Sequence, residues 1–109
     1  MTMLYKFKSK AAGDVIMTGP SGDQILRIVG REPAPKGIFL PQDMPAAMAA
    51  LERAVLEEEA ARQRAEEEAR AEGKELPPQE GVSLRQRVWP LIEMMKRAHA
   101  ADKEIVWGV

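Results

Sequence analysis

The segment LYKFKSK, residues 4–10, decides the fold because polar and apolar side chains alternate along it. Alternation of this kind is typical of a strand with one buried and one exposed face. We expect Tyr5 and Phe7 to face the core, and the lysines between and after them to face solvent. Gly13 predicts a turn over residues 11–14, and DVIMT, residues 14–18, predicts a second strand. The chain is therefore expected to open with a β-hairpin.

A short helix is expected after this hairpin. Ser21 and Gln24 have the spacing of a capping box, in which each side chain binds a backbone N–H at the helix start. Gly30 is well placed to end the helix in the left-handed conformation. Residues 25–29 are rich in Ile and Val, so a third strand over them is the alternative. The two end signals favour the helix.

A short strand and a long helix are expected next. GIFL, residues 37–40, follows a proline-containing loop and ends at Pro41, which suits an edge strand. The long helix is predicted from the N-cap Asp43 to Glu72, a length of roughly 45 Å. The apolar stripe of its first half consists of Met44, Met48, Leu51 and Val55.

The second half of this helix and the loop after it form an acidic segment, residues 57–80. Residues 42–80 contain five basic and eleven acidic side chains, whereas both flanks are mildly basic. Pairs at i,i+4 spacing, Glu58 with Arg62 and Glu66 with Arg70, are expected to stabilise the helix. Consecutive glutamates on a helix point about 100° apart, so these triplets do not predict a metal site. The segment is expected to protrude from the small core.

A last helix and a last strand complete the chain. SLRQ, residues 83–86, repeats the capping-box spacing. Pro90 lies inside the helical pattern, so the helix is expected either to kink there or to begin only near Trp89. IVW, residues 105–107, predicts a strand that must pair inside the sheet to be stable. The buried stripe of the helix is expected to contain Leu84, Val88, Leu91, Ile92, Met95, Ala98 and His99.

These elements predict one α+β domain over residues 1–109. A small, mostly antiparallel sheet, made of the N-terminal hairpin and the C-terminal strand, should be covered by the short helix and a long helical hairpin. Apolar residues at 45% and charged residues at 30% are typical of a globular protein. The absence of cysteine excludes disulfides and thiolate metal sites. No apolar run suits a membrane helix or a signal peptide, so a cytoplasmic location is expected.

Several motifs resemble those of one known family. They are MLYKFKSK at 3–10, GDVIM at 13–17, GIFLP at 37–41, SLRQR at 83–87, WPL at 89–91 and IVWGV at 105–109. With these motifs the chain resembles a small, mainly proteobacterial family catalogued only as a domain of unknown function, number eighteen-forty in that series. The resemblance implies a short bacterial cytosolic protein, and it carries over no catalytic residues.

No catalytic, cofactor or metal site is predicted. His99 is the single histidine, and its place near a helix end favours a structural or exposed role. The helix start at Ser21-Gln24 can offer backbone N–H groups to an anion, although a plain capped turn is the commoner meaning. Nucleic-acid binding is not expected, because the alternating lysines of residues 6–10 have no exposed aromatic residues among them.

The remaining candidates are partner surfaces. Trp89 lies outside the stripe of its helix and, with Trp107, is a candidate to line a groove or a dimer seam. Packing of both tryptophans within the monomer is the alternative. The helical charges Glu58, Arg62, Glu66 and Arg70 form a second candidate surface. The leading hypothesis is a non-enzymatic protein-interaction or oligomerisation module, either a homodimer or a complex with an unidentified protein. The alternative is a small-ligand or anion-binding protein.

Overall fold

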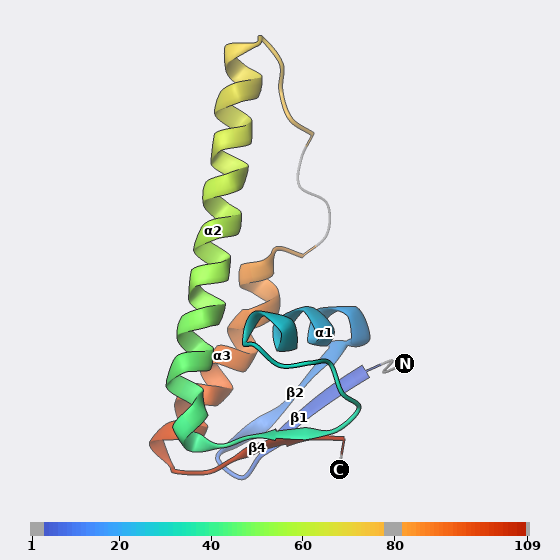
Figure 1. Cartoon of the computed structure of the whole chain (residues 1–109), viewed down its shortest axis with the longest axis vertical. Helices are drawn as coiled ribbons and strands as arrows, with labels where there is room; N and C mark the ends of the chain where they lie inside the picture. Colours follow the sequence, from blue (N-terminus) through green and yellow to red (C-terminus); the bar gives the residue numbers. More distant parts are fainter. Residues whose placement is uncertain (1–3, 78–81, 109) are drawn as a thin grey trace.

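A four-stranded antiparallel sheet and a layer of helices make up the molecule, which confirms the predicted α+β class (Figure 1). The computed structural model describes residues 4–77 and 82–108. In chain order the elements are β1 (Leu4–Ser9), β2 (Ala12–Thr18), α1 (Gly19–Ile28), β3 (Gly37–Phe39), the 3-10 turn η1 (Pro41–Asp43), α2 (Met44–Ala71), α3 (Leu84–Ala100) and β4 (Ile105–Trp107).

The strands are ordered β2-β1-β4-β3, so the last strand of the chain lies inside the sheet, as expected. β4 pairs with β1 through Phe7 and Trp107, and with β3 through Ile38 and Val106. The predicted turn over residues 11–14 is wrong, because β2 already begins at Ala12, which pairs with Ser9. The pairing shifts register between Phe7 and Ser9, and this irregularity lets the hairpin close over Lys10 and Ala11.

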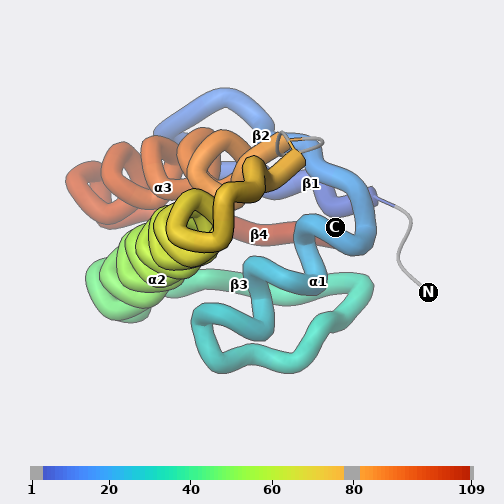
Figure 2. Tube along the Cα trace, turned by 90° about the horizontal axis from the view of Figure 1, so that it is seen from above, coloured from blue at the N-terminus to red at the C-terminus, as the bar shows by residue number. Residues whose placement is uncertain are grey.

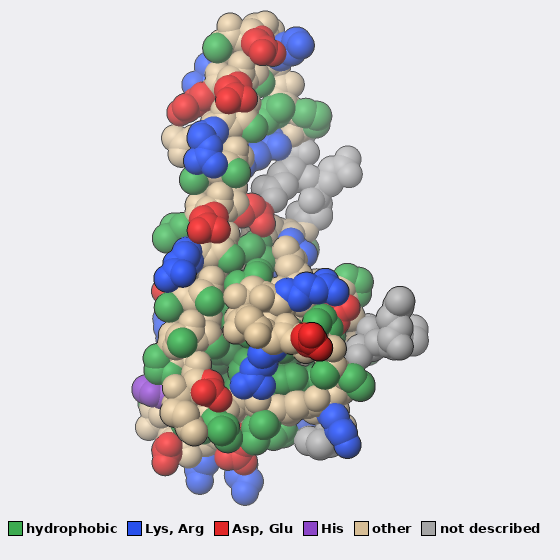
Figure 3. All heavy atoms as spheres, in the orientation of Figure 1, with side chains coloured by type: hydrophobic (Ala, Val, Ile, Leu, Met, Phe, Trp, Pro, Cys, Tyr) green, Lys and Arg blue, Asp and Glu red, His purple; other side chains and the backbone are tan. Residues whose placement is uncertain are grey.

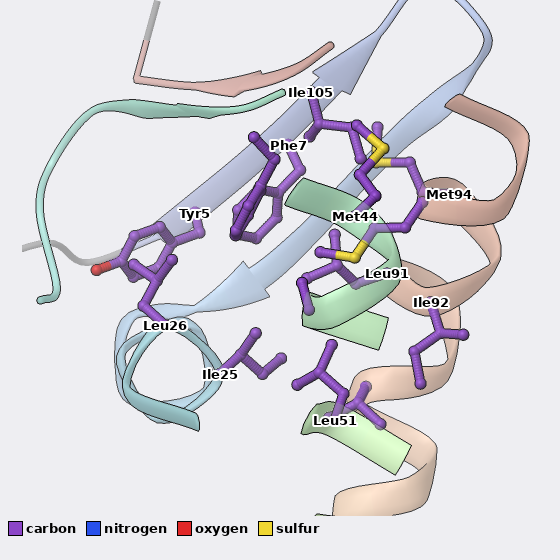
Figure 4. Close-up of a cluster of buried hydrophobic side chains, with 14 of the residues drawn as sticks. Tyr5, Phe7, Ile25, Leu26, Met44, Leu51, Leu91, Ile92, Met94 and Ile105 are labelled. Carbon is purple, nitrogen blue, oxygen red and sulfur yellow. The ribbon is translucent and has the colours of Figure 1, made fainter. Parts of the chain in front are cut away.

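The helices lie on one face of the sheet (Figures 1 and 2). Tyr5 and Phe7 point toward them and are 1% and 0% exposed, as the alternation predicted. Leu4 and Ile16 remain exposed on the opposite face. Figure 4 shows how β1 and the helices meet in one apolar core, whose side chains include Tyr5, Phe7, Ile25, Leu26, Met44, Leu51, Leu91, Ile92, Met94 and Ile105.

The start of α1 differs from the prediction. The helix begins at Gly19 with Thr18 as N-cap, and no side chain caps it. The capping box of Ser21 and Gln24 is therefore wrong. Proline in the first turn needs no N–H partner, so Pro20 opens the helix instead of preceding it. Residues 25–28 are helical, and Gly30 ends the helix with a φ of 85°, both as predicted.

The long helix has the predicted extent, from Met44 to Ala71. Met44, Leu51 and Val55 of the predicted stripe are buried. Asp43 is the N-cap residue, as predicted, but its side chain makes no capping hydrogen bond. Its carboxylate Oδ2 lies 3.5 Å from Nη2 of Arg31. The preceding 3-10 turn places Asp43 in a helical conformation, from which its side chain cannot reach the free N–H groups of the helix.

The last helix begins at Leu84 and contains Pro90 in its interior, so the alternative start near Trp89 is wrong. The capping box of Ser83 and Gln86 is present with both of its bonds. The predicted stripe is buried except at His99, which is exposed, and Met94 is buried in addition. Of the predicted loop at residues 73–81, positions 78–81 lie outside the described residues.

Candidate functional site

The second half of α2 forms an arm that rises beyond α3 (Figure 1). The chain that follows the helix returns along the arm, and Nη2 of Arg62 donates to the carbonyl oxygen of Pro77 at 2.7 Å. Nε of the same guanidinium donates to Oε1 of Glu66 at 3.0 Å. The predicted ion pair of Glu66 with Arg70 is wrong. Glu66 pairs instead with Arg62, the arginine that also binds the returning chain at Pro77. Arg62 and Glu66 thus serve an internal contact of the arm.

The acidic residues at the base of the arm attach α3 to α2. Oε1 of Glu58 accepts from the backbone N–H of Leu84 at 3.5 Å. The carboxylate of Glu59 accepts two bonds of 2.8 Å from Nε and Nη2 of Arg85. Negative charge is favourable beside the N-terminus of a helix, where backbone N–H groups are free. Glu58, predicted as a partner contact, therefore helps to fix the helical hairpin.

The pair of Glu59 and Arg85 shifts the titration of both groups. Hydrogen bonds from Arg85, together with its positive charge, hold the pKa of Glu59 below its ordinary value of 4.5 against a smaller opposing effect of desolvation. The same bonds and charge raise the pKa of Arg85. Because the pKa of Glu59 is depressed, the pair stabilises the fold above the ordinary pKa, and that contribution is lost as pH falls through the folded value.

Glu59→Gln is expected to weaken the acid dependence of stability slightly. The effect should be small because the pair is exposed to solvent and salt screens it. Urea unfolding at neutral pH and near pH 3 measures it, and the difference between the two midpoints should be smaller in the variant. Glu67→Gln is the matched control, an exposed glutamate of the same helix with no ion pair to a described residue. An equal change in both variants would contradict the assignment.

An apolar groove lies between α2 and α3 below the arm. Its floor consists of Val55, Val88 and Ile92, which are at most 4% exposed. Above this floor stand Leu56, 61% exposed, and Trp89, 47% exposed. The cavity has a volume of about 200 Å³, and Glu52 and Arg85 complete its walls. Two large apolar side chains are thus exposed side by side on the helical hairpin.

Trp107 is not part of this groove. It is 3% exposed, and its ring lies 5.6 Å from that of Phe7 and 5.1 Å from that of Phe39. Its Nε1 donates to the carbonyl oxygen of Ala34 at 3.0 Å. The prediction that Trp107 lines a groove with Trp89 is therefore wrong, and the alternative of core packing is confirmed for Trp107. Trp107 points inward because it faces Phe7 across the β1–β4 pair. Side chains of residues that face each other on paired strands point to the same side of the sheet, and Phe7 points toward the helices.

The exposure of Leu56 was not predicted from the sequence. The signal was present, because Leu56 directly follows the last residue of the buried stripe, Val55, and a helix turns about 100° per residue. A leucine one step beyond the stripe must lie at its border. The position of Trp89 relative to the buried stripe of α3 likewise predicts that it lies at the border of that stripe. In the structure, Leu56 and Trp89 line the same groove.

The residues proposed for an anion site are engaged within the molecule. Ser21 Oγ accepts from Oγ1 of Thr18 at 3.1 Å, and Oε1 of Gln24 accepts from Nη1 of Arg87 at 3.0 Å. Within residues 4–77 and 82–108, no three His, Cys, Asp or Glu side chains gather closely enough to hold a metal ion. No helix in that part of the chain combines the length and hydropathy needed to cross a membrane.

The fold and the groove define a class: a small α+β domain with an open-faced antiparallel sheet, a helical layer and a charged helical arm beside an exposed apolar groove. The chain belongs to the family described as a domain of unknown function (DUF1840), whose model matches residues 3–107. The family resemblance of the sequence motifs is thereby confirmed. No curated protein and no solved structure matches the chain.

Proposed function

We propose that this chain is a non-enzymatic interaction module of the bacterial cytosol that self-associates through the groove between α2 and α3. The observation that supports the proposal is the pair of exposed apolar side chains, Leu56 and Trp89, above a floor of buried apolar residues. Singly scattered apolar residues are ordinary on protein surfaces, whereas adjacent ones beside a groove are typical of contact sites. Tryptophan is also among the residues that contribute most to binding energy.

The charges at the groove favour a second copy of the chain as its occupant. On the α2 side stands Glu52, which makes no ion pair with any described residue. On the α3 side stand Arg85, which is already paired with Glu59, and Lys96, whose Nζ lies 5.3 Å from the ring centroid of Trp89 and 3.5 Å from Oε1 of Glu93. A twofold axis places the same patch of both copies against each other. The acidic wall of one copy then faces the basic wall of the other, and each Leu56 meets an apolar floor.

The arm supports the proposal less directly. Acidic and basic side chains alternate over its surface, as Figure 3 shows, and such exposed pairs contribute little binding energy. The alternative function, an anion held at Ser21-Gln24, has weaker support. Helix α1 begins three residues earlier than that proposal required, with Thr18 and not Ser21 as N-cap, and Gln24 already binds Arg87.

Leu56→Glu is expected to convert the dimer to a monomer. The substitution places a charge in the buried centre of the interface of both copies, and glutamate keeps the helix propensity of this exposed position. We expect the dissociation constant to rise at least about tenfold, since two apolar contacts are lost by symmetry. Sedimentation velocity over a concentration series measures the change. A wild-type chain that stays monomeric at all concentrations would overturn the proposal.

Two controls separate the groove from general surface effects. Ile16→Glu makes the same kind of change at a side chain of equal exposure, 60%, on the open sheet face, and should leave the dimer intact. Glu52→Lys and Lys96→Glu should each weaken the dimer, whereas the double variant should restore it, because the opposed charges are exchanged together. Failure of the double variant to recover would contradict the twofold arrangement.

A further inference from the structure

The two edges of the sheet differ in how they are protected. β3 has three residues and lies between Pro35 and Pro41. Nη1 of Arg31 donates to the carbonyl oxygen of Ile38 at 2.6 Å, and its guanidinium lies 4.6 Å from the ring centroid of Phe39. Short length, flanking prolines and a bound carbonyl are devices that block strand addition. The β3 edge is therefore protected against the addition of another strand.

β2, at the other edge, has only one of these devices, Pro20, which follows two residues after its end as Pro41 follows β3. It is seven residues long, and its sequence AGDVIMT contains neither proline nor lysine. Within the described residues its only strand partner is β1. In an antiparallel pair every second residue of an edge strand directs its N–H and C=O away from the partner. β2 therefore presents a row of backbone donors and acceptors to any extended chain beside it.

A groove of about 780 Å³ runs along this edge. One wall is the edge strand from Asp14 to Thr18, and the other is α3 at Gln86, Arg87 and Pro90. Val82, 57% exposed, completes the apolar part of the lining together with Val15 and Met17. Pro90 has no N–H, so the carbonyl of Gln86 lacks its helical partner on this wall. The groove thus combines an open strand edge with apolar side chains.

Arg87 gives the groove a chemical preference. Its Nη1 donates to Oε1 of Gln24 at 3.0 Å, but its Nε is buried and has no hydrogen-bond acceptor among the described residues. No carboxylate of residues 4–77 and 82–108 forms an ion pair with it. A buried donor of a charged group without an acceptor is unfavourable. Nε itself is closed to solvent, so a carboxylate in the groove would pair with the part of the Arg87 guanidinium that lines it, and a guanidinium without a counter-charge favours such a group.

We propose that the β2 edge binds an extended segment of a partner protein, with an acidic side chain of that segment paired to Arg87. The segment adds a strand to the sheet, and alternate residues point to the helical side. One inward residue is therefore acidic, and an inward residue two positions away is apolar and contacts Val15 and Val82. Backbone bonds supply affinity, and Arg87 supplies selectivity.

A second copy of β2 fits this groove less well. Its inward residues are Val15 and Met17, which carry no carboxylate. Its single acid, Asp14, lies on the opposite face, where Oδ2 is 3.5 Å from Nζ of Lys6. Strand pairing between two copies would leave both Arg87 side chains without a counter-charge. The site is also separate from the groove of Leu56 and Trp89, so it does not depend on the proposed self-association.

The test uses a blocked synthetic peptide as long as β2, seven residues, with threonine at outward positions and valine, glutamate and valine at inward ones. Its twin has glutamine in place of glutamate. Amide NMR spectra of the full chain, labelled with nitrogen-15, report binding. We expect the acidic peptide to shift and protect the amides of residues 14–18, and the twin to bind about tenfold more weakly.

Variants of the groove decide the role of Arg87. Arg87→Gln should bind both peptides equally, and Val82→Glu, which keeps Arg87 but replaces an apolar contact by a charge, should weaken both peptides, the acidic one more strongly. Leu56→Glu should leave peptide binding unchanged. Absence of shifts at residues 14–18, equal affinity of both peptides for the wild-type chain, or self-pairing of β2 in the free protein would each overturn the proposal.

Discussion

A chain that ends at Glu104 is expected to remain unfolded. It lacks β4, which lies between β1 and β3 and carries the buried side chains of Ile105 and Trp107, 0% and 3% exposed. Losing such side chains from a core costs about 2–5 kcal/mol each, and a domain of this size has about 5–15 kcal/mol in total. β3 also loses its strand partner. Far-UV circular dichroism and amide NMR dispersion measure the loss.

Point substitutions show whether this effect comes from packing. Ile105→Ala and Trp107→Ala should each lower the free energy of unfolding by about 2–5 kcal/mol. Val106→Thr, on the open sheet face of the same strand, should change it by less than about 1 kcal/mol, because threonine keeps the branched shape and the site is only partly buried. A shortened chain with a native spectrum would show that β4 is dispensable.

Gly22→Ala is expected to destabilise the protein by about 2 kcal/mol, although alanine is the better helix former. Gly22 is buried on α1, and an added Cβ would lie 2.0 Å from Cδ2 of Tyr5. The ring cannot easily withdraw, because it stacks on Phe7 at 5.9 Å and its hydroxyl donates to Asp23. Thermal unfolding should show a melting temperature about 10 °C lower.

Gly13→Ala is the matched control for this substitution. Gly13 lies in β2, and nothing stands within 4 Å of a Cβ built there. Alanine should therefore be neutral or slightly stabilising, because it restricts the unfolded chain. If Gly22→Ala were equally harmless, the close approach of α1 to β1 would not be needed for the fold.

Local patterns predicted most of the elements of this fold. The alternation around Tyr5 and Phe7, the stripe of α2 and the capping box of Ser83 each specify a structure within a few residues of themselves. The prediction failed where a neighbour in space competes for a side chain. Gln24 has the spacing of a capping residue but binds Arg87 of another helix, and the side chain of Asp43 pairs with Arg31 instead of bonding to the start of α2.

The candidate surfaces were also predicted only as far as local patterns reach. Trp89 and the charged residues of the arm were found from the sequence because helical periodicity shows which residues lie off the buried stripe. The periodicity does not show which of them meet. Only the packing of α2 on α3 places Leu56 beside Trp89 and brings Glu59 within hydrogen-bond distance of Arg85.

The sequence by itself determined that this chain opens with a half-buried hairpin, continues into a long charged helix and closes with a strand, because each property depends on residues a few positions apart. Tertiary structure alone decided that Trp107 is buried against Phe7 and Phe39, that Leu56 lies beside Trp89, and that β2 forms an open edge beside Arg87. These properties depend on contacts between segments far apart in the chain, and no local pattern specifies them.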